Sequence, residues 1–439
     1  MRASPPQVLV FGFLLLIFGG AVLLTLPAAV APGRRVDFLT SLFTATSAVC
    51  VTGLTVVDTA GHWSAFGHAV ILFLIQVGGL GFMTMATFFA MLLGRRIGLR
   101  QRLIMQESLS QTNVAGIVRL ARYVLLFTFS VEAFFAALLA VRWSADLGWP
   151  GCVWYGIFHS VSAFNNAGFD LFGGFKSLTG YAEDVTVNLC ITSLIILGGL
   201  GFSVVVELIQ YLRGARRHLT LHSKMVLLMT GLLIAGGTAL IFALESHNAL
   251  LNLSPKGKFL ASFFQSVTPR TAGYNTLEIA HLRPATQFLL IVFMFTGASP
   301  GSTGGGIKTT TVGILTAFVW SFARGRADVE VFGRRLAKEQ IYKAFTIALL
   351  SLLLVITVSF LLSITEKASF LAVLFETVSA FGTVGLSTGL TPELSVPGRI
   401  LIALTMFLGR LGPLTVAFAA AQAKSRSSLR YPEEKIMVG

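Results

Sequence analysis

Glycine recurs at four points of this 439-residue chain where the backbone itself could do chemistry. Each glycine follows a short apolar stretch and precedes a long hydrophobic segment. The four neighbourhoods read VCVTGL (49–54), FNNAGF (164–169), PRTAGY (269–274) and GTVGLS (382–387), with Gly53, Gly168, Gly273 and Gly385 at their centres. The glycines lie 115, 105 and 112 residues apart, and each follows a phenylalanine by ten residues: Phe43, Phe158, Phe263 and Phe375. Regular recurrence of one unit predicts four walls around one axis.

The chemistry that suits these glycines is coordination of a cation. Rings of backbone carbonyls replace the water shell of an ion without adding fixed charge, and glycine adopts the backbone angles that aim carbonyls inward. We therefore predict a filter from three residues of each unit: Val51, Thr52, Gly53, Asn166, Ala167, Gly168, Thr271, Ala272, Gly273, Thr383, Val384 and Gly385. Each strand has one glycine, whereas the TVGYG filter of tetrameric potassium channels has two, and this predicts weaker geometric discrimination among cations. An anion pore would need basic rings, and only Arg270 flanks a glycine, where it is expected to anchor the strand from behind.

Composition places the chain in a membrane. Hydrophobic residues make up 54% and charged residues 12%, which excludes an ordinary soluble domain of this length. The net charge of +14 is concentrated in the stretches 95–122, 213–224, 324–343 and 424–435, on one side of the predicted spans. That bias places these stretches in the cytoplasm and argues against a nucleic-acid-binding face. The run 8–30 is too long for a typical signal peptide and is taken as the first span.

The elements that must hold the four glycines follow from hydropathy. Eight apolar segments are long enough to cross a bilayer: 7–30, 66–93, 118–142, 185–212, 223–245, 286–322, 340–363 and 397–422. Four shorter stretches between them, 37–48, 152–164, 257–267 and 369–380, can enter the bilayer only as re-entrant half-helices. The fold predicted is an all-α membrane protein of four consecutive helix, pore half-helix, filter and helix units, in pseudo-fourfold arrangement around one pore. The units are 1–94, 95–212 with a cytoplasmic linker, 213–322 with an intramembrane loop at 297–311, and 323–439 with a cytoplasmic tail.

Two features are candidates for a gate. The second helix of each unit carries a glycine cluster, which reads GGLGF at 78–82 and 198–202 and GRLGP at 409–413, so Arg410 takes a glycine's place. A mid-membrane arginine is costly, and it can either repel ions or close a loop by bonding to carbonyls; the alternative is a structural arginine that caps half-helix carbonyls. In the third unit GASPGSTGGGIKTTT (297–311) interrupts the helix, which predicts a flexible plug. The gate residues are Gly297, Pro300, Gly301, Ser302, Thr303, Gly304, Gly305, Gly306, Lys308 and Arg410.

Other motifs give weaker signals. Ile307 between Gly306 and Lys308 spoils a phosphate-binding loop, and close helix packing explains the GGLGF clusters. For Glu132, inside a long helix, pairing with a basic group is favoured over facing a polar cavity, and for Glu376 capping of the fourth half-helix is favoured over attracting cations. The three cysteines and seven histidines show no spacing of a metal site, so no resident metal is expected.

The longer motifs resemble a known family. LFTATSAVCVTGLTVVDT (42–59), QVGGLGFMT (76–84), SVSAFNNAGFDLF (160–172), SVTPRTAGYNT (266–276), FETVSAFGTVGLSTGLT (375–391) and PEEKIMVG (432–439) resemble the membrane subunits of the Trk/Ktr/HKT potassium transporters, the KtrB type above all. The resemblance implies K⁺ as the transported ion, Na⁺ as an activator, and gating by Arg410 together with the loop of the third unit. It also implies a homodimer in the bacterial inner membrane, with both termini cytoplasmic, on a nucleotide-binding ring of KtrA type. The chain itself is expected to bind no nucleotide and no covalent cofactor.

Three alternatives stay open at this stage. An intramembrane enzyme would need a nucleophile with a base at membrane depth, and Glu132, Lys308 and Arg410 are too dispersed for that, so no enzyme is predicted. A purely structural subunit would have no use for four filter strands. Within the transport class, a less selective sodium/potassium or ammonium pore is the realistic neighbour. The stretches 95–122 and 213–224 and the C-terminal tail are expected to dock the partner ring.

Overall fold

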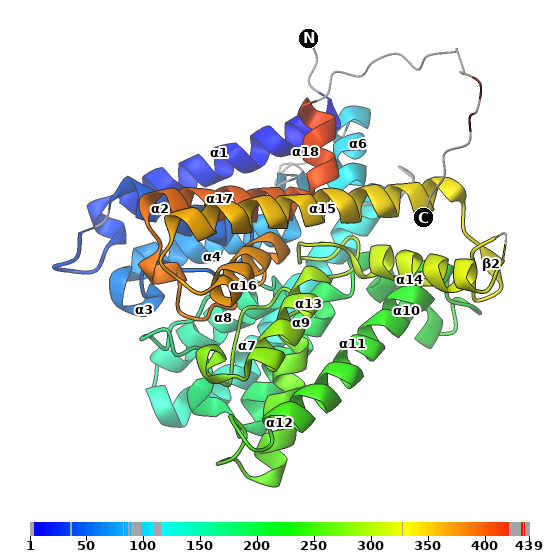
Figure 1. The fold of residues 1–439 in the computed structure, drawn as a ribbon. Helices are drawn as coiled ribbons and strands as arrows, with labels where there is room; N and C mark the ends of the chain where they lie inside the picture. Colours follow the sequence, from blue (N-terminus) through cyan, green and yellow to red (C-terminus); the bar gives the residue numbers. More distant parts are fainter. Residues whose placement is uncertain are drawn as a thin grey trace.

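The computed structural model describes residues 4–35, 37–81, 83–86, 88, 98–108, 116–326, 328–420, 432 and 434. These residues form helices and a single short hairpin of β1 (Glu330–Val331) and β2 (Arg334–Arg335). Three parts named above lie outside the described residues: Phe82 of the first glycine cluster, residues 109–115 of the basic linker, and the tail PEEKIMVG apart from positions 432 and 434. The expected all-α architecture is confirmed (Figure 1).

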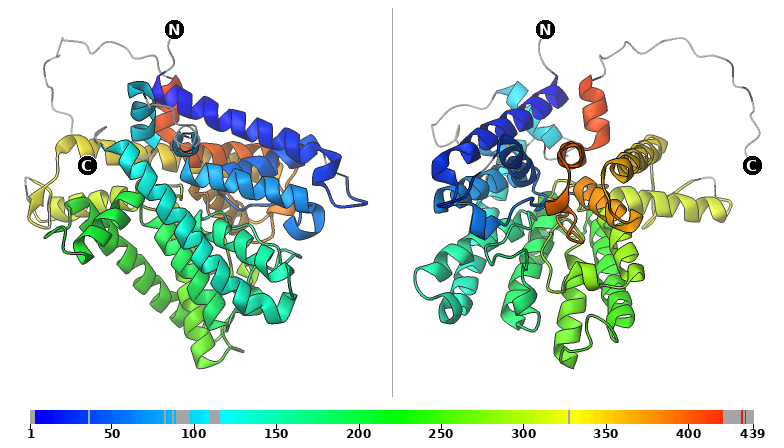
Figure 2. Two further views of the ribbon diagram at one scale, coloured as in Figure 1. Left: turned by 180° about the vertical axis from the view of Figure 1, so that it is seen from behind. Right: turned by 60° about the vertical axis from the view of Figure 1, so that its left-hand side comes forward.

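Each of the four units begins with one long, continuous helix. These are α1 (Pro5–Thr25), α7 (Ile117–Leu147), α11 (Leu221–Glu245) and α15 (Lys338–Thr365). Within the described residues they are the four helices long and apolar enough to cross a membrane without a break. Figure 2 shows α7 lying across the face that Figure 1 hides. The helix α6 (Leu99–Ser108) comes before α7 in the second unit, and the small helix α3 (Thr59–His62) follows the first glycine strand.

Four short helices lie where the sequence predicts re-entrant half-helices. They are α2 (Phe38–Val49), α8 (Gly151–Phe164), α12 (Pro255–Val267) and α16 (Phe370–Gly382). Local chemistry explains their starts: the Ser254 and Ser369 hydroxyls accept hydrogen bonds from backbone N–H groups of the first turns of α12 and α16. Such caps satisfy donors that would otherwise be left bare where a helix starts.

The second helix of each unit is not the continuous span that hydropathy predicts. These helices are α4 (Ala65–Leu80), α9 and α10 (Val185–Gly199 and Phe202–Leu212), α13 and α14 (Pro284–Phe295 and Thr309–Ala323), and α17 and α18 (Val396–Leu411 and Pro413–Ala420). Gly81, Gly201 and Gly412 have φ angles of 81°, 92° and 83°, which end the helix. At Gly201 the chain turns by 103° between α9 and α10. Hydropathy therefore misses the breaks in the first, second and fourth units, whereas the interruption of the third by the stretch 297–311 is the one expected from its sequence.

The same clusters also allow close packing, as expected. A Cβ on Gly78, Gly198 or Gly409 would overlap the carbonyl oxygen of the last or next-to-last residue of the neighbouring half-helix. Glycine therefore lets the second helix touch the C-terminal end of the half-helix backbone to backbone.

The four units contact one another in a closed cycle. Each long first helix packs against the half-helix of its own unit, in the pairs α1–α2, α7–α8, α11–α12 and α15–α16. Each second helix packs against the half-helix of the next unit, in the pairs α4–α8, α9–α12, α13–α16 and α17–α2. The last pair joins the fourth unit to the first, and α18 lies against the start of α1 (Figure 1). There Gln7 of α1 donates a hydrogen bond to the carbonyl of Ala419 in α18. The division of the chain at 94, 212 and 322 stays a prediction.

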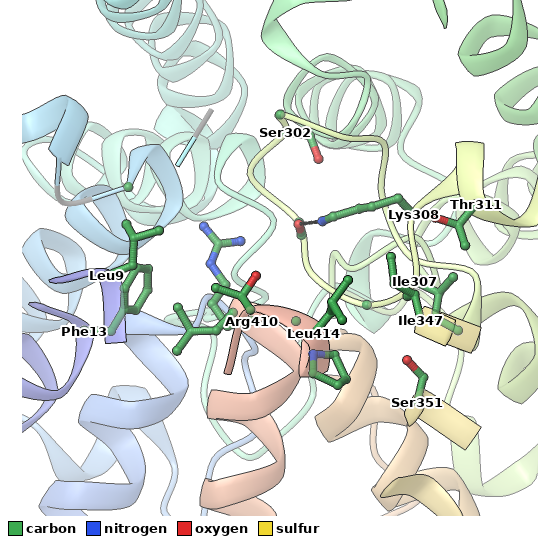
Figure 3. A pocket seen from close by; sticks show the side chains of 18 of the residues that line it. Leu9, Phe13, Ser302, Ile307, Lys308, Thr311, Ile347, Ser351, Arg410 and Leu414 are labelled. Carbon is green, nitrogen blue, oxygen red and sulfur yellow. Dashed lines mark hydrogen bonds between the residues drawn. The ribbon is translucent and has the colours of Figure 1, made fainter. Parts of the chain in front are cut away.

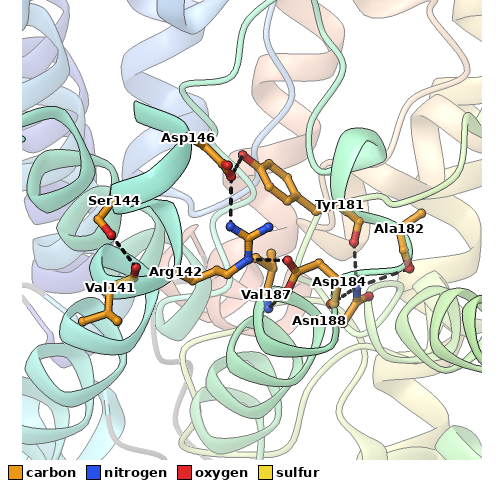
Figure 4. A network of polar contacts seen from close by, with 9 residues as sticks. All are labelled: Val141, Arg142, Ser144, Asp146, Tyr181, Ala182, Asp184, Val187 and Asn188. Carbon is orange, nitrogen blue, oxygen red and sulfur yellow. Dashed lines mark hydrogen bonds and ion pairs between the residues drawn. The ribbon is translucent and has the colours of Figure 1, made fainter. Parts of the chain in front are cut away.

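A polar network joins two helices of the second unit at the end remote from α18. Arg142, near the end of α7, donates to Asp184, the N-cap of α9, at 2.5 Å and to Asp146 at 3.1 Å (Figure 4). Tyr181 also donates to Asp146, and Asn188 of α9 donates to the carbonyl of Tyr181. These contacts join α7 to α9, and both helices pack against the half-helix α8.

Candidate ion-conduction site

The four glycines that the sequence singles out meet at one place. A Cβ built on Gly53 would lie 3.1 Å from the Cα of Gly168, and one built on Gly168 would lie 2.9 Å from the Cα of Gly273. One built on Gly273 would lie 3.3 Å from the Cα of Gly385, and one on Gly385 would lie 3.1 Å from the Cα of Gly53. The contacts close a ring of four strands that the sequence separates by more than a hundred residues each.

The backbone of the four strands repeats one unusual conformation. The φ angle is positive at each glycine, between 69° and 92°, and again two residues earlier, at Val51, Asn166, Thr271 and Thr383, between 50° and 74°. The residue between the two is not in the left-handed region. Three of the four earlier residues are β-branched, for which positive φ is strained. Alternation of left-handed and ordinary residues turns successive carbonyls toward the same side of a strand, which is the arrangement that a carbonyl filter needs.

Serines that the sequence analysis missed hold three of the strands in place. Ser47, Ser162 and Ser379 lie six residues before the glycine of the first, second and fourth units. Their carbonyls accept from the residue before the glycine, each at 2.8 Å. The hydroxyls of the first and last also accept from the N–H of Gly53 and Gly385, at 3.0 and 3.1 Å. The repeat at a fixed distance from the glycine was the available signal.

The third unit is shifted by one residue relative to the others. Thr268, five residues before Gly273, takes the place of the serine: its carbonyl accepts from Ala272 at 3.0 Å and its hydroxyl donates to the carbonyl of Tyr274. Phe264, not Phe263, is the fully buried ring of this half-helix. The equal ten-residue spacing therefore does not mark equal structural positions in the third unit.

Arg270 supports its strand from behind, as expected. The residue is buried, at 2% exposure, and its guanidinium donates to the Thr230 hydroxyl of α11 at 3.1 Å. Asn166 and Thr271 link the second and third strands, since the amide and the hydroxyl lie 3.2 Å apart. The strands are therefore joined to each other and to the surrounding helices.

The expected role of Glu376 as a cap is wrong. The residue lies in the middle of α16, fully buried, while Ser369 caps that half-helix. Glu376 accepts from the Ser387 hydroxyl at 3.0 Å and from the Thr391 hydroxyl, so it ties the half-helix to the segment that follows Gly385. His159 holds the corresponding position of α8, next to buried Phe158, and its ring lies 3.3 Å from the backbone N–H of Leu171.

The loop of the third unit lies directly against the strands. Gly305 donates its backbone N–H to the Thr383 hydroxyl at 3.1 Å, and a Cβ on Gly304 would overlap the Thr271 hydroxyl. Thr303 bonds to the second unit through its N–H, which donates to Gly198, and its hydroxyl, which donates to the carbonyl of Phe164. The loop is therefore an ordered segment in this structure, held between the second unit and the fourth strand.

Other residues of the loop fasten its two ends. Ser299 donates its N–H to the carbonyl of Gly199 at 3.1 Å, and Phe202 of α10 donates to the carbonyl of Gly301 at 2.9 Å. The Ser302 hydroxyl donates to the carbonyl of Ser299 at 2.6 Å. Pro300, the residue after Ser299, also lies at this break: a Cβ on Gly201 would lie 2.5 Å from the carbonyl oxygen of Pro300. The break between α9 and α10 thus provides the seat for the loop.

Arg410 joins this loop to the first unit. Its guanidinium donates to the carbonyl of Thr303, to that of Gly78 at 2.5 Å and to that of Gly79 at 3.1 Å. Lys308 donates to the carbonyls of Gly304 and Gly305, at 2.7 and 3.4 Å. Both cations therefore bond to backbone oxygens next to the strands, and Gly297 and Gly306 approach each other closely enough to exclude a side chain.

A cavity of about 430 Å³ opens beside the loop. Figure 3 shows Lys308 reaching into it from the loop and Arg410 from α17. Leu9 and Phe13 of α1 lie on the side away from Lys308. Lys343 of α15 adds a third basic group, and no Asp or Glu of the described chain lines the space. This part of the site is thus electropositive, in contrast to the uncharged carbonyls of the strands.

The expected ion pair of Glu132 is not formed. Glu132 is 4% exposed, and among the described residues it has no basic partner; it accepts hydrogen bonds from Gln76 and Asn165 instead. No group of three or more metal-ligating side chains occurs in the part of the chain that the structure describes.

Comparison with known proteins gives a single family. The sequence profile of TrkH, described as a cation transport protein, matches residues 7–431. The chain is 43% identical to Ktr system potassium uptake protein B of Bacillus subtilis, over all of this chain and 98% of that protein. It is 40% identical to the potassium/sodium uptake protein NtpJ of Enterococcus hirae, over all of this chain and 98% of that protein.

A solved structure agrees at the level of the fold. The potassium transporter TrkH from Vibrio parahaemolyticus superposes with a TM-score of 0.75 at 20% identity, covering 96% of this chain and 85% of that one. The full-length matches and the four-strand ring lead to one conclusion: the chain belongs to the TrkH family of cation transport proteins, as a non-enzymatic membrane subunit of the KtrB type.

Proposed function

We propose that this chain is the potassium-translocating membrane subunit of a Ktr-type uptake system. The observation that carries the proposal is the closed ring of Gly53, Gly168, Gly273 and Gly385, with the same two left-handed positions in every strand. The relatives named for potassium uptake support the choice of ion. Four strands around one pseudo-fourfold axis would present the carbonyls of the twelve predicted filter residues to a K⁺ ion stripped of water.

The gate in this proposal consists of the third-unit loop and Arg410. Three positive groups, Lys308, Lys343 and Arg410, line the cavity beside the loop, and a cation there would meet repulsion and a closed backbone. Because the guanidinium bonds to carbonyls of both the loop and the first unit, its release would free the loop to move. The arrangement therefore corresponds to a closed state in which Arg410 acts both as a latch and as an electrostatic barrier.

The membrane orientation, the partners and the activating ion are proposed from the charge distribution and from the family resemblance. Basic stretches on one side of the spans support an orientation with both termini on the cytoplasmic side, and the relatives support a bacterial inner membrane. The chain would form a homodimer, and a nucleotide-binding ring of KtrA type would dock on the stretches 95–122 and 213–224 and on the C-terminal tail. Sodium would act as an activator and K⁺ as the substrate, with no covalent cofactor on this chain.

A less selective pore is the second candidate. The relative named for potassium and sodium uptake, and the single glycine per strand, favour some passage of Na⁺. Ammonium is a further competitor because its size is close to that of K⁺.

The test is ion flux into proteoliposomes of the purified chain. Uptake of ⁸⁶Rb⁺ is measured with and without Na⁺, and with Na⁺ or NH₄⁺ as competitors. We expect Rb⁺ uptake that K⁺ suppresses far more strongly than Na⁺ does, and that Na⁺ at low concentration enhances. Equal suppression by K⁺ and Na⁺ would favour the less selective pore, and no uptake by folded protein with its partner ring would refute conduction altogether.

A further inference from the structure

Three polar side chains form a closed triangle inside the membrane part of the fold. Gln76 of α4 donates to one carboxylate oxygen of Glu132 in α7 at 3.1 Å. Asn165, at the C-terminal end of α8, donates to the other carboxylate oxygen at 3.1 Å and to the side-chain oxygen of Gln76 at 2.8 Å. The triangle therefore joins the first unit to two elements of the second.

Burying the Glu132 carboxylate of this triangle within the membrane part of the fold costs free energy. Glu132 is 4% exposed and Asn165 fully buried, and no Lys or Arg of the described chain pairs with the carboxylate. Among the described residues, Glu132 and Gln76 are also the only side chains with hydrogen-bonding oxygens in a groove of about 470 Å³ lined otherwise by aliphatic and aromatic residues. An acidic residue that a membrane protein retains at such a cost marks a functional role.

Asn165 connects the triangle directly to the filter. It is the residue immediately before Asn166, Ala167 and Gly168, and its side chain also donates to the carbonyl of Val161 at 2.9 Å. The Ser160 hydroxyl adds a second tie, since it donates to the backbone carbonyl of Glu132 at 2.8 Å. The end of α8 and the start of its strand are thus fixed to α7.

On its other side Asn165 touches α4, the helix whose carbonyls accept hydrogen bonds from Arg410. Its side-chain oxygen has no hydrogen-bond partner among the described residues and lies against Gly79, where an added Cβ would overlap it. The carbonyl of the same Gly79 accepts from Arg410 at 3.1 Å. One side chain thus lies between the second filter strand and the proposed latch.

The triangle needs a carboxylate in particular. Asn165 and Gln76 both turn amide nitrogens toward Glu132, which can accept from both because it has two acceptor oxygens. A glutamine at 132 would place its own NH₂ against one of those donors. To restore the bonds Asn165 would have to turn over, losing its bond to Val161 and changing its contact with Gly79.

The other strands have different supports at the equivalent position. Three residues before the glycine stand Cys50, Asn165, Arg270 and Gly382. Only the second and third of these reach an outer helix by side-chain hydrogen bonds, Asn165 to Glu132 and Arg270 to Thr230. A change at Glu132 would therefore deform the ring from one side.

We propose that Glu132 is a positioning residue for ion selection. Through Asn165 it fixes the position of the second filter strand and, because Asn165 also lies against Gly79, the position of the C-terminal end of α4. The inference rests on the proposed potassium-conducting function. It assigns no contact between Glu132 and the ion.

The experiment compares variants by ⁸⁶Rb⁺ uptake into proteoliposomes, as the ratio of inhibition by K⁺ to inhibition by Na⁺. We expect E132Q and N165A to lower this ratio about tenfold, the equivalent of one lost hydrogen bond to a charged group. E132D keeps two acceptor oxygens at a shorter reach and is expected to stay closer to the wild type than E132Q does. A role in filling space predicts the opposite order, because glutamine has the volume of glutamate.

Glu245 supplies a matched control. It is also a fully buried glutamate, at the end of α11, and it accepts from Asn248 at 2.7 Å and from the backbone of Arg283 at 3.0 Å, away from the strands. E245Q should lower the melting temperature of the purified protein but leave the inhibition ratio unchanged. A ratio for E132Q equal to that of the wild type, or E132D further from the wild type than E132Q, would overturn the inference while leaving the proposed function intact. Lack of uptake by the wild type would instead overturn the function.

Discussion

Replacement of Arg410 by alanine should open the pore. The wild-type guanidinium makes three hydrogen bonds, to the carbonyls of Thr303, Gly78 and Gly79, across the junction of the fourth, third and first units. A hydrogen bond from a charged group contributes ~1.5–3 kcal/mol, and bonds that share one group do not add fully. A net loss of about 2.8 kcal/mol from the closed state corresponds to a roughly 100-fold higher open-to-closed ratio.

The assay is the rate of ⁸⁶Rb⁺ leak into proteoliposomes that contain the chain without its partner ring. R410A should leak up to about 100-fold faster than the wild type while the closed state still dominates. Arg410→Lys keeps the charge but cannot bond to three carbonyls at once, so it separates the latch from the electrostatic barrier. Arg399 on the same helix, which donates to the carbonyl of Leu394 at 3.0 Å, provides the control R399A. Folded R410A protein that leaks no faster than the wild type would refute the latch.

Three further results are expected. G385A should abolish selective uptake, because its Cβ would overlap the carbonyl of Thr52, whereas G389A has the same positive φ but open space around it and should cost only folding stability, as thermal unfolding and ⁸⁶Rb⁺ uptake together would reveal. Burial raises the pKa of Asp170, two residues after a filter glycine, to about 6. Its negative charge is therefore present above that pH and lost below it, so uptake should fall as the pH on the side of the membrane that Asp170 faces drops from 7.5 to 5. D170N should show lower uptake that no longer depends on pH in this range. S379A removes the acceptor of the Gly385 N–H and should lower the K⁺-to-Na⁺ inhibition ratio severalfold, and an unchanged ratio would show that the serine carbonyl alone holds the strand.

The half-helices were predictable because their signal is local. A short apolar run with a glycine ten residues after a phenylalanine recurs four times, and a serine caps two of the four half-helices. Re-entrant length follows from counting residues. The predicted ranges differ from α2, α8, α12 and α16 by no more than two residues at either end. The meeting of the four glycines also follows from the repeat, since units that share a plan and a membrane tend to arrange around one axis.

The helix breaks were not predictable from hydropathy. Gly81, Gly201 and Gly412 stand inside long apolar runs, and glycine in such runs commonly serves packing. At the second break the loop of the third unit accepts a hydrogen bond from Phe202 through the carbonyl of Gly301, a contact between units that hydropathy does not encode. The roles of Glu132 and Glu376 were misjudged for the same reason. Their partners are neutral amides and hydroxyls, and for Glu132 they lie on helices distant in sequence.

The one unit that differs from the others explains why a single plug can serve a four-part ring. Three second helices break at one glycine, but the third is interrupted by the whole stretch between Phe295 and Thr309. Only glycine fits at 304 and 305, because a Cβ there would overlap the hydroxyls of filter-strand threonines. At these two positions the loop carries no side chain that could hold it, so its fastening falls to other groups, such as Thr303 within the loop and Arg410 outside it. Arg410 is such a group, and it stands where the first and second units have glycine, so one substitution in one repeat supplies the latch that the loop of another repeat requires.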